Sequence, residues 1–403
     1  MKKILLSLAL AAAVLLSGGC TREWVSSWAT ALQVAEPHNL PPAPGLADNS
    51  FRQIVQLSIG GQALRLQLSN LYNDAPTEIL GVEIARAASL GASPDIVPGT
   101  SVPLTFGGRR GVTMAPGEEV LSDPVRLHLE DRATLAVTIH YGSVARSPMT
   151  SHPGSRTTSY LAAGDTEDFS EALRTDHWYS LGRIDVVPRR RGAAAIAVLG
   201  DSITDGRGTT TNGQDRWTDQ LSRSLLEDAL TRDLAVLNFG LGGNCVLHGG
   251  NGPAAQSRYE HDLFGPCGVR YIILFEGTND LGTNPDEAAT AEQIKAVYRD
   301  IIRAAHGRGI KVYGATVTSA KGSFYDRSGT GEHSRGRAVL NAWIRESGEF
   351  DGVIDFDRMV ADPAQPDRLD PALLYQNDWL HLNAQGYEMM GRGIDRALFK
   401  NRR

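Results

Sequence analysis

The chain lacks several features that would narrow its function at once. It has only 3 cysteines in 403 residues, so a dense disulfide framework cannot be what holds the fold together. Its net charge is −6 and no basic stripe runs along it, which argues against a nucleic-acid partner. Beyond the first twenty residues, no apolar run resembles a membrane span. The hydrophobic share of 41% and the charged share of 21% are those of an ordinary globular protein with a real core.

The first twenty residues have the pattern of an export signal. Lys2 and Lys3 precede the apolar stretch from Ile4 to Leu16, and small residues follow at 17–19. The segment resembles a bacterial lipoprotein signal, in which Cys20 would be the lipidated first residue of the mature protein. Ser17 stands where such signals usually carry leucine, so ordinary cleavage stays open. We expect an exported protein, periplasmic or at the cell surface and anchored by a lipid, with a secreted soluble protein as the alternative.

The other two cysteines are Cys245 and Cys267. An exported chain meets an oxidising compartment, so the default expectation is a disulfide between them. Two buried thiols are the alternative.

The length of the chain suggests two domains, and the hydrophobic period changes near the middle. From residue 21 to 187, apolar and polar residues alternate with period two, as expected of half-buried strands. The segments 55–59 and 64–68 flank Gly60 and Gly61, which predicts a β-hairpin around a glycine turn. We predict an all-β, sandwich-like domain over residues 21–187.

The second half, residues 188–403, has continuous apolar runs with helical stripes between them. The runs suit strands buried on both faces, and they cover residues 193–199, 234–239, 269–275, 311–317 and 352–356. Strands that alternate with helices in this way predict a parallel, doubly wound α/β sheet.

Four short motifs follow predicted strands in order along this half: "GDSI" from Gly200, "NFGLGGN" from Asn238, "EGTNDLG" from Glu276 and "NDWLHLN" from Asn377. Together they resemble the blocks of the SGNH, or GDSL, hydrolases, which are serine esterases and acylhydrolases. The resemblance implies a flavodoxin-like, three-layer α/β/α fold and an esterase that needs no cofactor. The carboxylates and histidines show no spacing typical of metal ligands.

The resemblance assigns a catalytic triad by position. Ser202 matches the nucleophile, His381 the general base and Asp378 the residue that orients the histidine. A serine hydroxyl is a weak nucleophile at neutral pH and needs such a base beside it. A carboxylate three residues before the histidine can reach the far ring nitrogen in a turn-like segment. Leu382 stands where the family often has proline.

The resemblance also implies an oxyanion hole. Its donors would be the backbone N–H of Ser202, the backbone N–H of Gly243 and the side chain of Asn279, with Gly242 as a near alternative to Gly243. Donors held in place before the reaction stabilise the alkoxide that forms when an ester carbonyl is attacked.

Other residues near these motifs are expected to shape the site rather than to react. Asp201 is expected to order the turn before Ser202 rather than to take part in the chemistry. The stretch from Asp205 through Asp215, Arg216 and Trp217 resembles a "GDSITDG…DRW" variant of exported members. There Asp215 and Arg216 would shape the loop beside the site and Trp217 would pack in the core. The segment Lys321–His333 either lines the site or is a surface loop.

We therefore expect an exported serine esterase. Its expected substrates are short-acyl esters, such as the acetyl esters of a polysaccharide. The alternatives are an arylesterase, lipase or lysophospholipase and, outside enzymes, a surface-anchored carbohydrate-binding protein.

Overall fold

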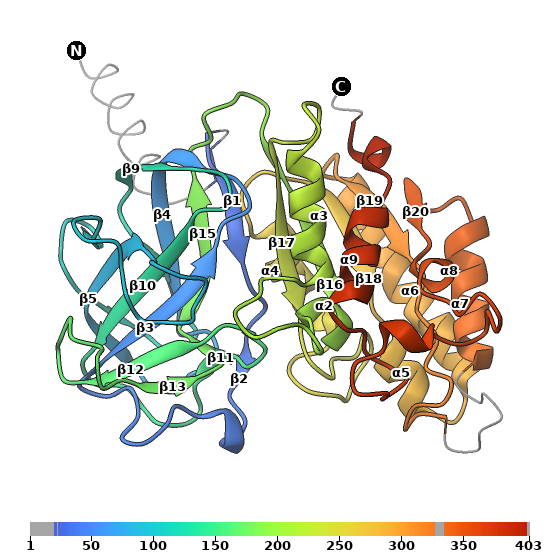
Figure 1. Ribbon diagram of the computed structural model, residues 1–403, viewed down its shortest axis with the longest axis horizontal. Helices are drawn as coiled ribbons and strands as arrows, with labels where there is room; N and C mark the ends of the chain where they lie inside the picture. Colours follow the sequence, from blue (N-terminus) through green and yellow to red (C-terminus); the bar gives the residue numbers. More distant parts are fainter. Residues whose placement is uncertain (1–19, 22, 327–333, 401–403) are drawn as a thin grey trace, which may run out of the picture.

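The computed structural model describes residues 20–21, 23–326 and 334–400. A block of antiparallel strands comes first and a block of alternating strands and helices follows, and the two lie side by side (Figure 1). The antiparallel part ends at Val186 and the parallel sheet begins at Ala194, so the predicted boundary after residue 187 falls in the connection. We call residues 21–187 the β-domain and residues 188–403 the α/β domain. Of the predicted signal, residues 1–19 lie outside the described part. Among the described residues, no helix has the length and apolar character that crossing a membrane requires.

The β-domain is sandwich-like, as predicted, and it contains three antiparallel sheets. The first has the order β1 (Val25–Ala29), β15 (Leu181–Val186), β4 (Gly61–Ser69) and β8 (Glu119–Leu121), with β9 (Val125–Leu129) also paired to β4. The second has the order β13 (Leu173–Thr175), β12 (Ser159–Ala163), β3 (Asn49–Gln56), β10 (Thr134–Tyr141), β5 (Thr77–Arg86) and β6 (Val102–Leu104), with β7 (Val112–Met114) paired to β5. The third joins β14 (Trp178–Tyr179), β11 (Thr150–His152) and β2 (Gln33–Val34).

The predicted hairpin around Gly60 and Gly61 is wrong. Strands β3 and β4 do form there, but β3 pairs with β10 and β12, whereas β4 pairs with β8, β9 and β15. The connection crosses from one sheet to the other instead of reversing within one. Gly60 is needed because a Cβ there would lie 2.1 Å from the carbonyl oxygen of Leu129. Period-two alternation reports that a segment is a strand, but it does not report the strand's partner.

The α/β domain is built on a five-stranded parallel sheet in the order β17 (Leu234–Gly240), β16 (Ala194–Gly200), β18 (Val269–Phe275), β19 (Lys311–Ala315) and β20 (Gly352–Ile354). Numbered along the domain, this order is 2-1-3-4-5, the flavodoxin-like arrangement that the resemblance implied. Between and after the strands lie α2 (Ser202–Asp205), α3 (Trp217–Leu226), α4 (Ala255–Phe264), α5 (Thr278–Thr283), α6 (Glu287–His306), α7 (Ser334–Glu346), α8 (Phe356–Met359) and α9 (Ala384–Gly393). The 3-10 helices are η1 (Pro37–Asn39), η2 (Pro371–Leu373) and η3 (Arg396–Phe399).

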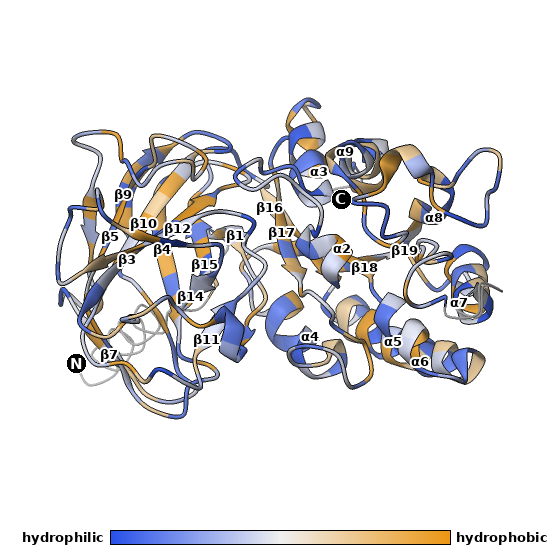
Figure 2. Ribbon diagram, turned by 60° about the horizontal axis from the view of Figure 1, so that its bottom comes forward, coloured by the Kyte–Doolittle hydropathy of each residue, from blue (hydrophilic) through white to orange (hydrophobic). Residues whose placement is uncertain are grey.

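Helices cover both faces of the parallel sheet. Ala195, Ala197 and Leu199 of β16 share a core with residues of α4, α6 and α7. The alternate residues of the same strand, from Ala194 to Val198, face α3 and α9. The apolar strands therefore run between two layers of helices (Figure 2). Burial on both faces explains why the strands appear in the sequence as continuous apolar runs.

The two domains meet along β17, which is an edge strand of the parallel sheet. Thr30, just after β1, forms a parallel bridge with Asn238 of β17. Ser58 Oγ donates to the carbonyl oxygen of Val236 over 2.9 Å and accepts from the N–H of the same residue over 3.1 Å. The β-domain thus satisfies backbone groups that an open sheet edge would leave unpaired.

The predicted Cys245–Cys267 disulfide is wrong. Cys267 is bonded to Cys20, and Cys245 is a free, buried thiol. Ser26 holds the two segments together, because its N–H donates to the carbonyl oxygen of Cys267 and its Oγ accepts from the N–H of Cys267. The same bond disagrees with the prediction that Cys20 is lipidated, since one sulfur cannot hold both a disulfide and a thioether.

We expect a proteolytic digest made without reduction to contain one linked peptide pair, carrying Cys20 and Cys267. Cys245 should react with an alkylating reagent only after unfolding, because it is buried. Mass spectrometry of protein alkylated before and after denaturation checks both points. Cys245→Ser should leave the linked pair intact, and a Cys245–Cys267 pair would contradict the assignment.

Replacing the serine that covers the sheet edge should destabilise the protein. Ser58→Ala strips two buried backbone groups of Val236 of their partner, which costs about 1–3 kcal/mol in the free energy of unfolding. Chemical denaturation measures the loss. Ser143→Ala, at an exposed position, is the matched control and should change the free energy of unfolding by less than about 0.5 kcal/mol.

Candidate active site

The serine lies where β16 ends and α2 begins, at the carboxyl edge of the parallel sheet. Asp201 caps α2, because its side chain accepts from the N–H of Ile203 over 2.9 Å. Ser202 is the first helical residue, and its Oγ lies 2.8 Å from His381 Nε2. A Cβ on Gly200 would lie 2.2 Å from Thr204 Oγ1, so only glycine lets the strand turn this sharply. The geometry is that of a hydroxyl in hydrogen-bond contact with a base.

The histidine is held by the residue predicted to orient it. His381 Nδ1 lies 2.7 Å from Asp378 Oδ2. The other carboxylate oxygen, Oδ1, accepts from the backbone N–H groups of Leu380 and His381 over 2.9 and 2.8 Å. With Nδ1 donating to the carboxylate, Nε2 carries the lone pair that faces the serine. The loop thus brings Ser202, His381 and Asp378 together in one chain of hydrogen bonds.

Burial and charge set the protonation of these groups. Burial lowers the pKa of His381, Asp378 opposes that shift, and the cations Arg207 and Arg156 add to it. Burial alone would raise the pKa of Asp378, but hydrogen bonds from His381 and Leu380 outweigh it and the pKa is lowered. A depressed histidine pKa keeps the imidazole neutral, the form that can accept a proton.

The cap residue Asp201 behaves differently, because burial raises its pKa to about 7 against the hydrogen bond from Ile203.

The candidate oxyanion donors lie around the serine. Gly242, Gly243 and Asn279 all line the same cleft as Ser202. Asn279 Nδ2 donates to the carbonyl oxygen of Asn244 over 2.7 Å, and its Oδ1 accepts from the Tyr325 hydroxyl over 2.6 Å. These two contacts fix the amide and leave its second N–H for a ligand. Gly243 has a φ of +71°, which favours glycine.

The cleft has a volume of about 600 Å³ and lies between the two domains. The β-domain supplies a wall that is mostly polar, made of Gln33, Glu36, His38, Asn39, Pro153, Gly154, Arg156 and His177. No pattern in the sequence predicts this wall. From the segment Lys321–His333, Phe324 and Tyr325 line the cleft, and Phe324 is 66% exposed. Residues 327–333 of that segment lie outside the described part.

Of the remaining predicted residues, Asp205 lines the cleft, whereas Asp215, Arg216 and Trp217 lie near it without lining it. Trp217 is fully buried against Phe275 and Phe356. Asp215 accepts from the N–H of Thr210 and so closes the turn before α3. Arg216 lines a separate, smaller cavity between the domains.

One cluster within the described residues has atoms close enough to hold a metal ion: Glu83, His140 and Glu167. It lies in the β-domain and none of its members lines the cleft. Its members already have polar partners in the protein, because Arg52 Nη2 lies 3.1 Å from Glu167 Oε2 and Asp165 Oδ1 lies 2.8 Å from His140 Nδ1.

Comparison with known proteins finds similarity in the α/β domain. Residues 198–389 match the family model of the GDSL-like lipase/acylhydrolase family. No curated protein sequence matches the chain.

Solved structures that resemble the chain do so at low identity. The acetyl xylan esterase AlAXEase is 20% identical over 49% of this chain and 96% of its own, with a TM-score of 0.37. A carbohydrate acetylesterase family member from Sinorhizobium meliloti is 20% identical over 51% and 97%, with a TM-score of 0.38. A GDSL-like lipase from Bacteroides thetaiotaomicron VPI-5482 is 19% identical over 53% and 91%, with a TM-score of 0.36. The match to the GDSL-like lipase/acylhydrolase family model spans all four motifs, so the chain is similar to that family over the residues that carry them.

Proposed function

We propose that the protein is a serine esterase that hydrolyses carboxylic esters through an acyl-enzyme. The observation that carries this proposal is the chain of contacts from Ser202 Oγ through His381 to Asp378, with distances of 2.8 and 2.7 Å. A nucleophile, a neutral base and an orienting carboxylate are what acyl transfer needs.

The reaction follows from the geometry. Ser202 Oγ attacks the ester carbonyl carbon while His381 Nε2 takes its proton. The resulting alkoxide would bind the backbone N–H groups of Ser202 and Gly243 and the free N–H of Asn279. The imidazolium then protonates the leaving alcohol, and Asp378 stabilises its charge. A water molecule, deprotonated by the same histidine, attacks the acyl-enzyme and releases the acid.

We propose that the alcohol side of the ester is a carbohydrate and that the acyl group is short, such as acetyl. The polar wall that the β-domain adds to the cleft supports a polar, hydroxyl-rich alcohol. The exposed ring of Phe324 at the same cleft supports stacking against the apolar face of a sugar ring.

Export is also part of the proposal. The signal pattern in the first residues and the disulfide between Cys20 and Cys267 both suit an oxidising compartment.

Removing the nucleophile should abolish hydrolysis. Ser202→Ala should lower kcat for p-nitrophenyl acetate by about 10⁴-fold or more, because no other group replaces the attacking oxygen. Rates with the acetate, octanoate and palmitate esters measure activity and acyl length together. Ser222→Ala, also a buried serine but outside the cleft, is the control and should keep its activity. Equal rates in wild type and Ser202→Ala would refute the mechanism, and a palmitate preference would refute the short acyl group.

The pH dependence of kcat/KM should show the effect of the neighbouring cations on the pKa of His381. Because the imidazole must be neutral to act as a base, kcat/KM should rise with pH and level off once His381 has lost its proton. Burial and the cations Arg207 and Arg156 lower that pKa, so the midpoint should lie below the ordinary histidine value. Arg207→Ala removes one cation and should move the midpoint to higher pH.

Arg207→Lys keeps the charge and should leave the midpoint in place. Profiles measured at low ionic strength suit this test, since salt screens an exposed charge. A midpoint that moves equally in both variants would contradict the electrostatic origin of the shift.

A further inference from the structure

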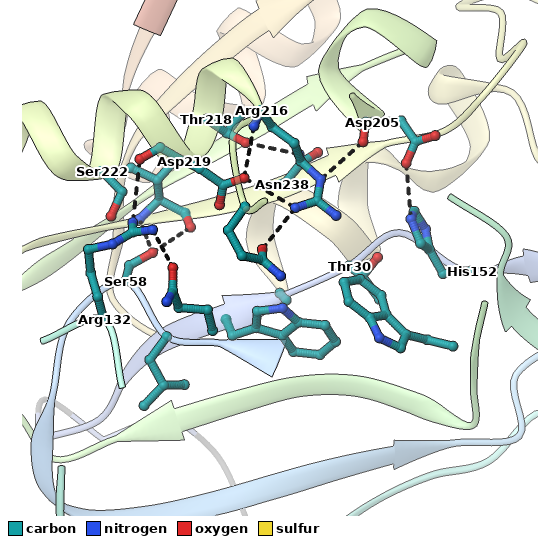
Figure 3. Close-up of a pocket in the computed structure, with 17 residues that line it drawn as sticks. Thr30, Ser58, Arg132, His152, Asp205, Arg216, Thr218, Asp219, Ser222 and Asn238 are labelled. Carbon is teal, nitrogen blue, oxygen red and sulfur yellow. Dashed lines mark hydrogen bonds and ion pairs between the residues drawn. The ribbon is translucent and has the colours of Figure 1, made fainter. Parts of the chain in front are cut away.

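A loop of the β-domain lies directly on the helix that carries the nucleophile. The loop connects β11 to β12 and spans residues 153–158, and His152 is the last residue of β11. Its contacts converge on Asp205, the last residue of α2, whose carboxylate is almost completely buried. Asp205 Oδ2 lies 2.8 Å from Arg156 Nη2, and Oδ1 lies 3.1 Å from His152 Nε2 (Figure 3 shows the second contact). Both partners belong to the other domain.

The histidine of this contact faces two acceptors. Its Nδ1 lies 2.9 Å from the carbonyl oxygen of Ala31, and its Nε2 faces the Asp205 carboxylate. The ring therefore contacts a carbonyl of the β-domain on one side and the carboxylate of α2 on the other. This contact crosses the domain boundary, and both side chains are shielded from solvent. Arg156 adds a permanent cation to the same carboxylate, and removing the cation from a pair with a buried carboxylate leaves an uncompensated charge.

The charge on Asp205 is maintained by these neighbours. Burial on its own would raise the pKa of Asp205, but Arg156, His152 and Arg216 outweigh that effect and the pKa is lowered. Two of these three neighbours, Arg156 and His152, belong to the β-domain.

The loop also fits α2 sterically. A Cβ on Gly154 would lie 2.0 Å from Asp205 Oδ2, so the carboxylate rests against backbone with no room for a side chain. On the opposite side, a Cβ on Gly240 would lie 2.3 Å from the Asp205 nitrogen. The end of α2 is thus held between β17 and the β-domain loop.

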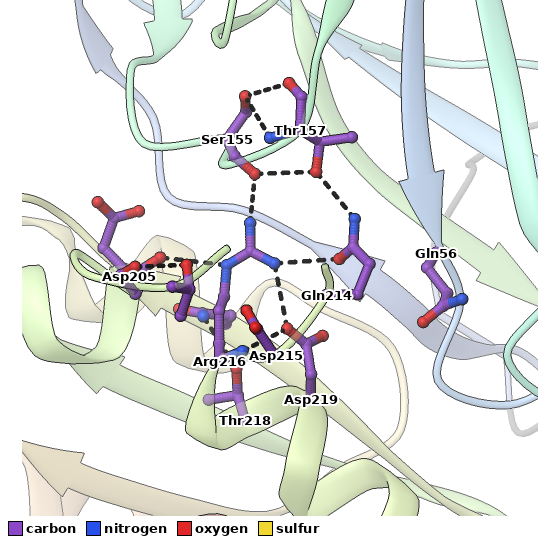
Figure 4. A network of polar contacts seen from close by, with 12 residues as sticks. Gln56, Ser155, Thr157, Asp205, Gln214, Asp215, Arg216, Thr218 and Asp219 are labelled. Atoms are coloured by element: carbon purple, nitrogen blue, oxygen red, sulfur yellow. Dashed lines mark hydrogen bonds and ion pairs between the residues drawn. The ribbon is translucent and has the colours of Figure 1, made fainter. Parts of the chain in front are cut away.

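Arg216 adds a second link between the loop and α2. Its Nε donates to the carbonyl oxygen of Asp205 over 3.1 Å, and its Nη2 donates to the carbonyl oxygen of Ser155 (Figure 4). Its Nη1 reaches Asp219 in the first turn of α3 over 3.1 Å. Gln214 extends the network, because its Nε2 donates to Thr157 Oγ1 over 2.8 Å.

We infer that His152 and Arg156 of the β-domain are positioning residues for Ser202, which they hold through Asp205, so that the active centre is completed by both domains. A helix of four residues does not hold its own geometry in isolation. Here its last residue is fixed from outside, while its first residue must stay 2.8 Å from the catalytic base. This inference rests on the proposed esterase function.

Two substitutions test it. Arg156→Ala and Asp205→Asn should each lower kcat for p-nitrophenyl acetate by about 10–100-fold, because a displacement of the nucleophile of about 1 Å costs on that order. Both should also slow the covalent labelling of Ser202 by a fluorophosphonate, which reports the nucleophile itself and needs no turnover. Arg156→Lys keeps the cation and should recover most of both rates. Thermal unfolding establishes that each variant is folded at the assay temperature.

Arg345→Ala is the matched control. Arg345 is similarly half-buried and pairs with Asp355 and Asp357, outside the cleft, so its loss should cost stability without changing kcat. The inference is overturned if Arg156→Ala raises only KM, or if Arg345→Ala lowers kcat and the labelling rate as much. A wild type that hydrolyses no ester, with Ser202→Ala no different, overturns the proposed function instead, and the labelling rates still decide the positioning.

Discussion

The contact between the β-domain and the edge strand β17 is the constraint on which the rest of the molecule depends. An exposed edge of a parallel sheet carries unpaired backbone groups, and here Ser58 and Thr30 of the β-domain cover them. Covering that edge places the β-domain beside the carboxyl ends of β16 and β17, where α/β sheets bind their ligands. The same contact that completes the sheet therefore also builds one wall of the cleft.

This arrangement divides the work between the two halves of the chain. The α/β domain supplies Ser202, His381 and Asp378, the groups proposed to react. The β-domain supplies polar surface to the cleft. Its residues His152 and Arg156 also contact Asp205 at the end of α2. On the proposed function, the two domains form one catalytic unit, and the β-domain is not a separate accessory module.

The sequence predicts the parts whose signals are local. The parallel strands appear as apolar runs because both faces are buried, and the serine, aspartate and histidine stand in motifs beside those runs. Strand pairing and disulfide pairing between segments far apart in the chain leave no such local pattern in the sequence. Strands β3 and β4 alternate correctly, yet each joins strands far away in the chain. Three cysteines allow three pairings, and only the folded chain selects Cys20 with Cys267.

The contacts of His152 and Arg156 with Asp205 could not be predicted either, because they also join segments that are far apart in the sequence. His152 and Asp205 are 53 positions apart, and a lone histidine or arginine in a β-rich segment has no distinctive pattern. Only the closeness of Gly154 to the carboxylate explains why a glycine stands in that loop.

The disulfide has a topological consequence for the intact chain. Cys20 lies before the β-domain and Cys267 lies within the α/β domain, 247 positions later. The connection between the domains contains Arg190 and Arg191, both exposed. A trypsin-like protease that cuts there would yield two fragments that still migrate as one species, because the covalent ring spans the cut. A molecule that has been cut once in this connection would keep its two domains together until a reductant broke the disulfide.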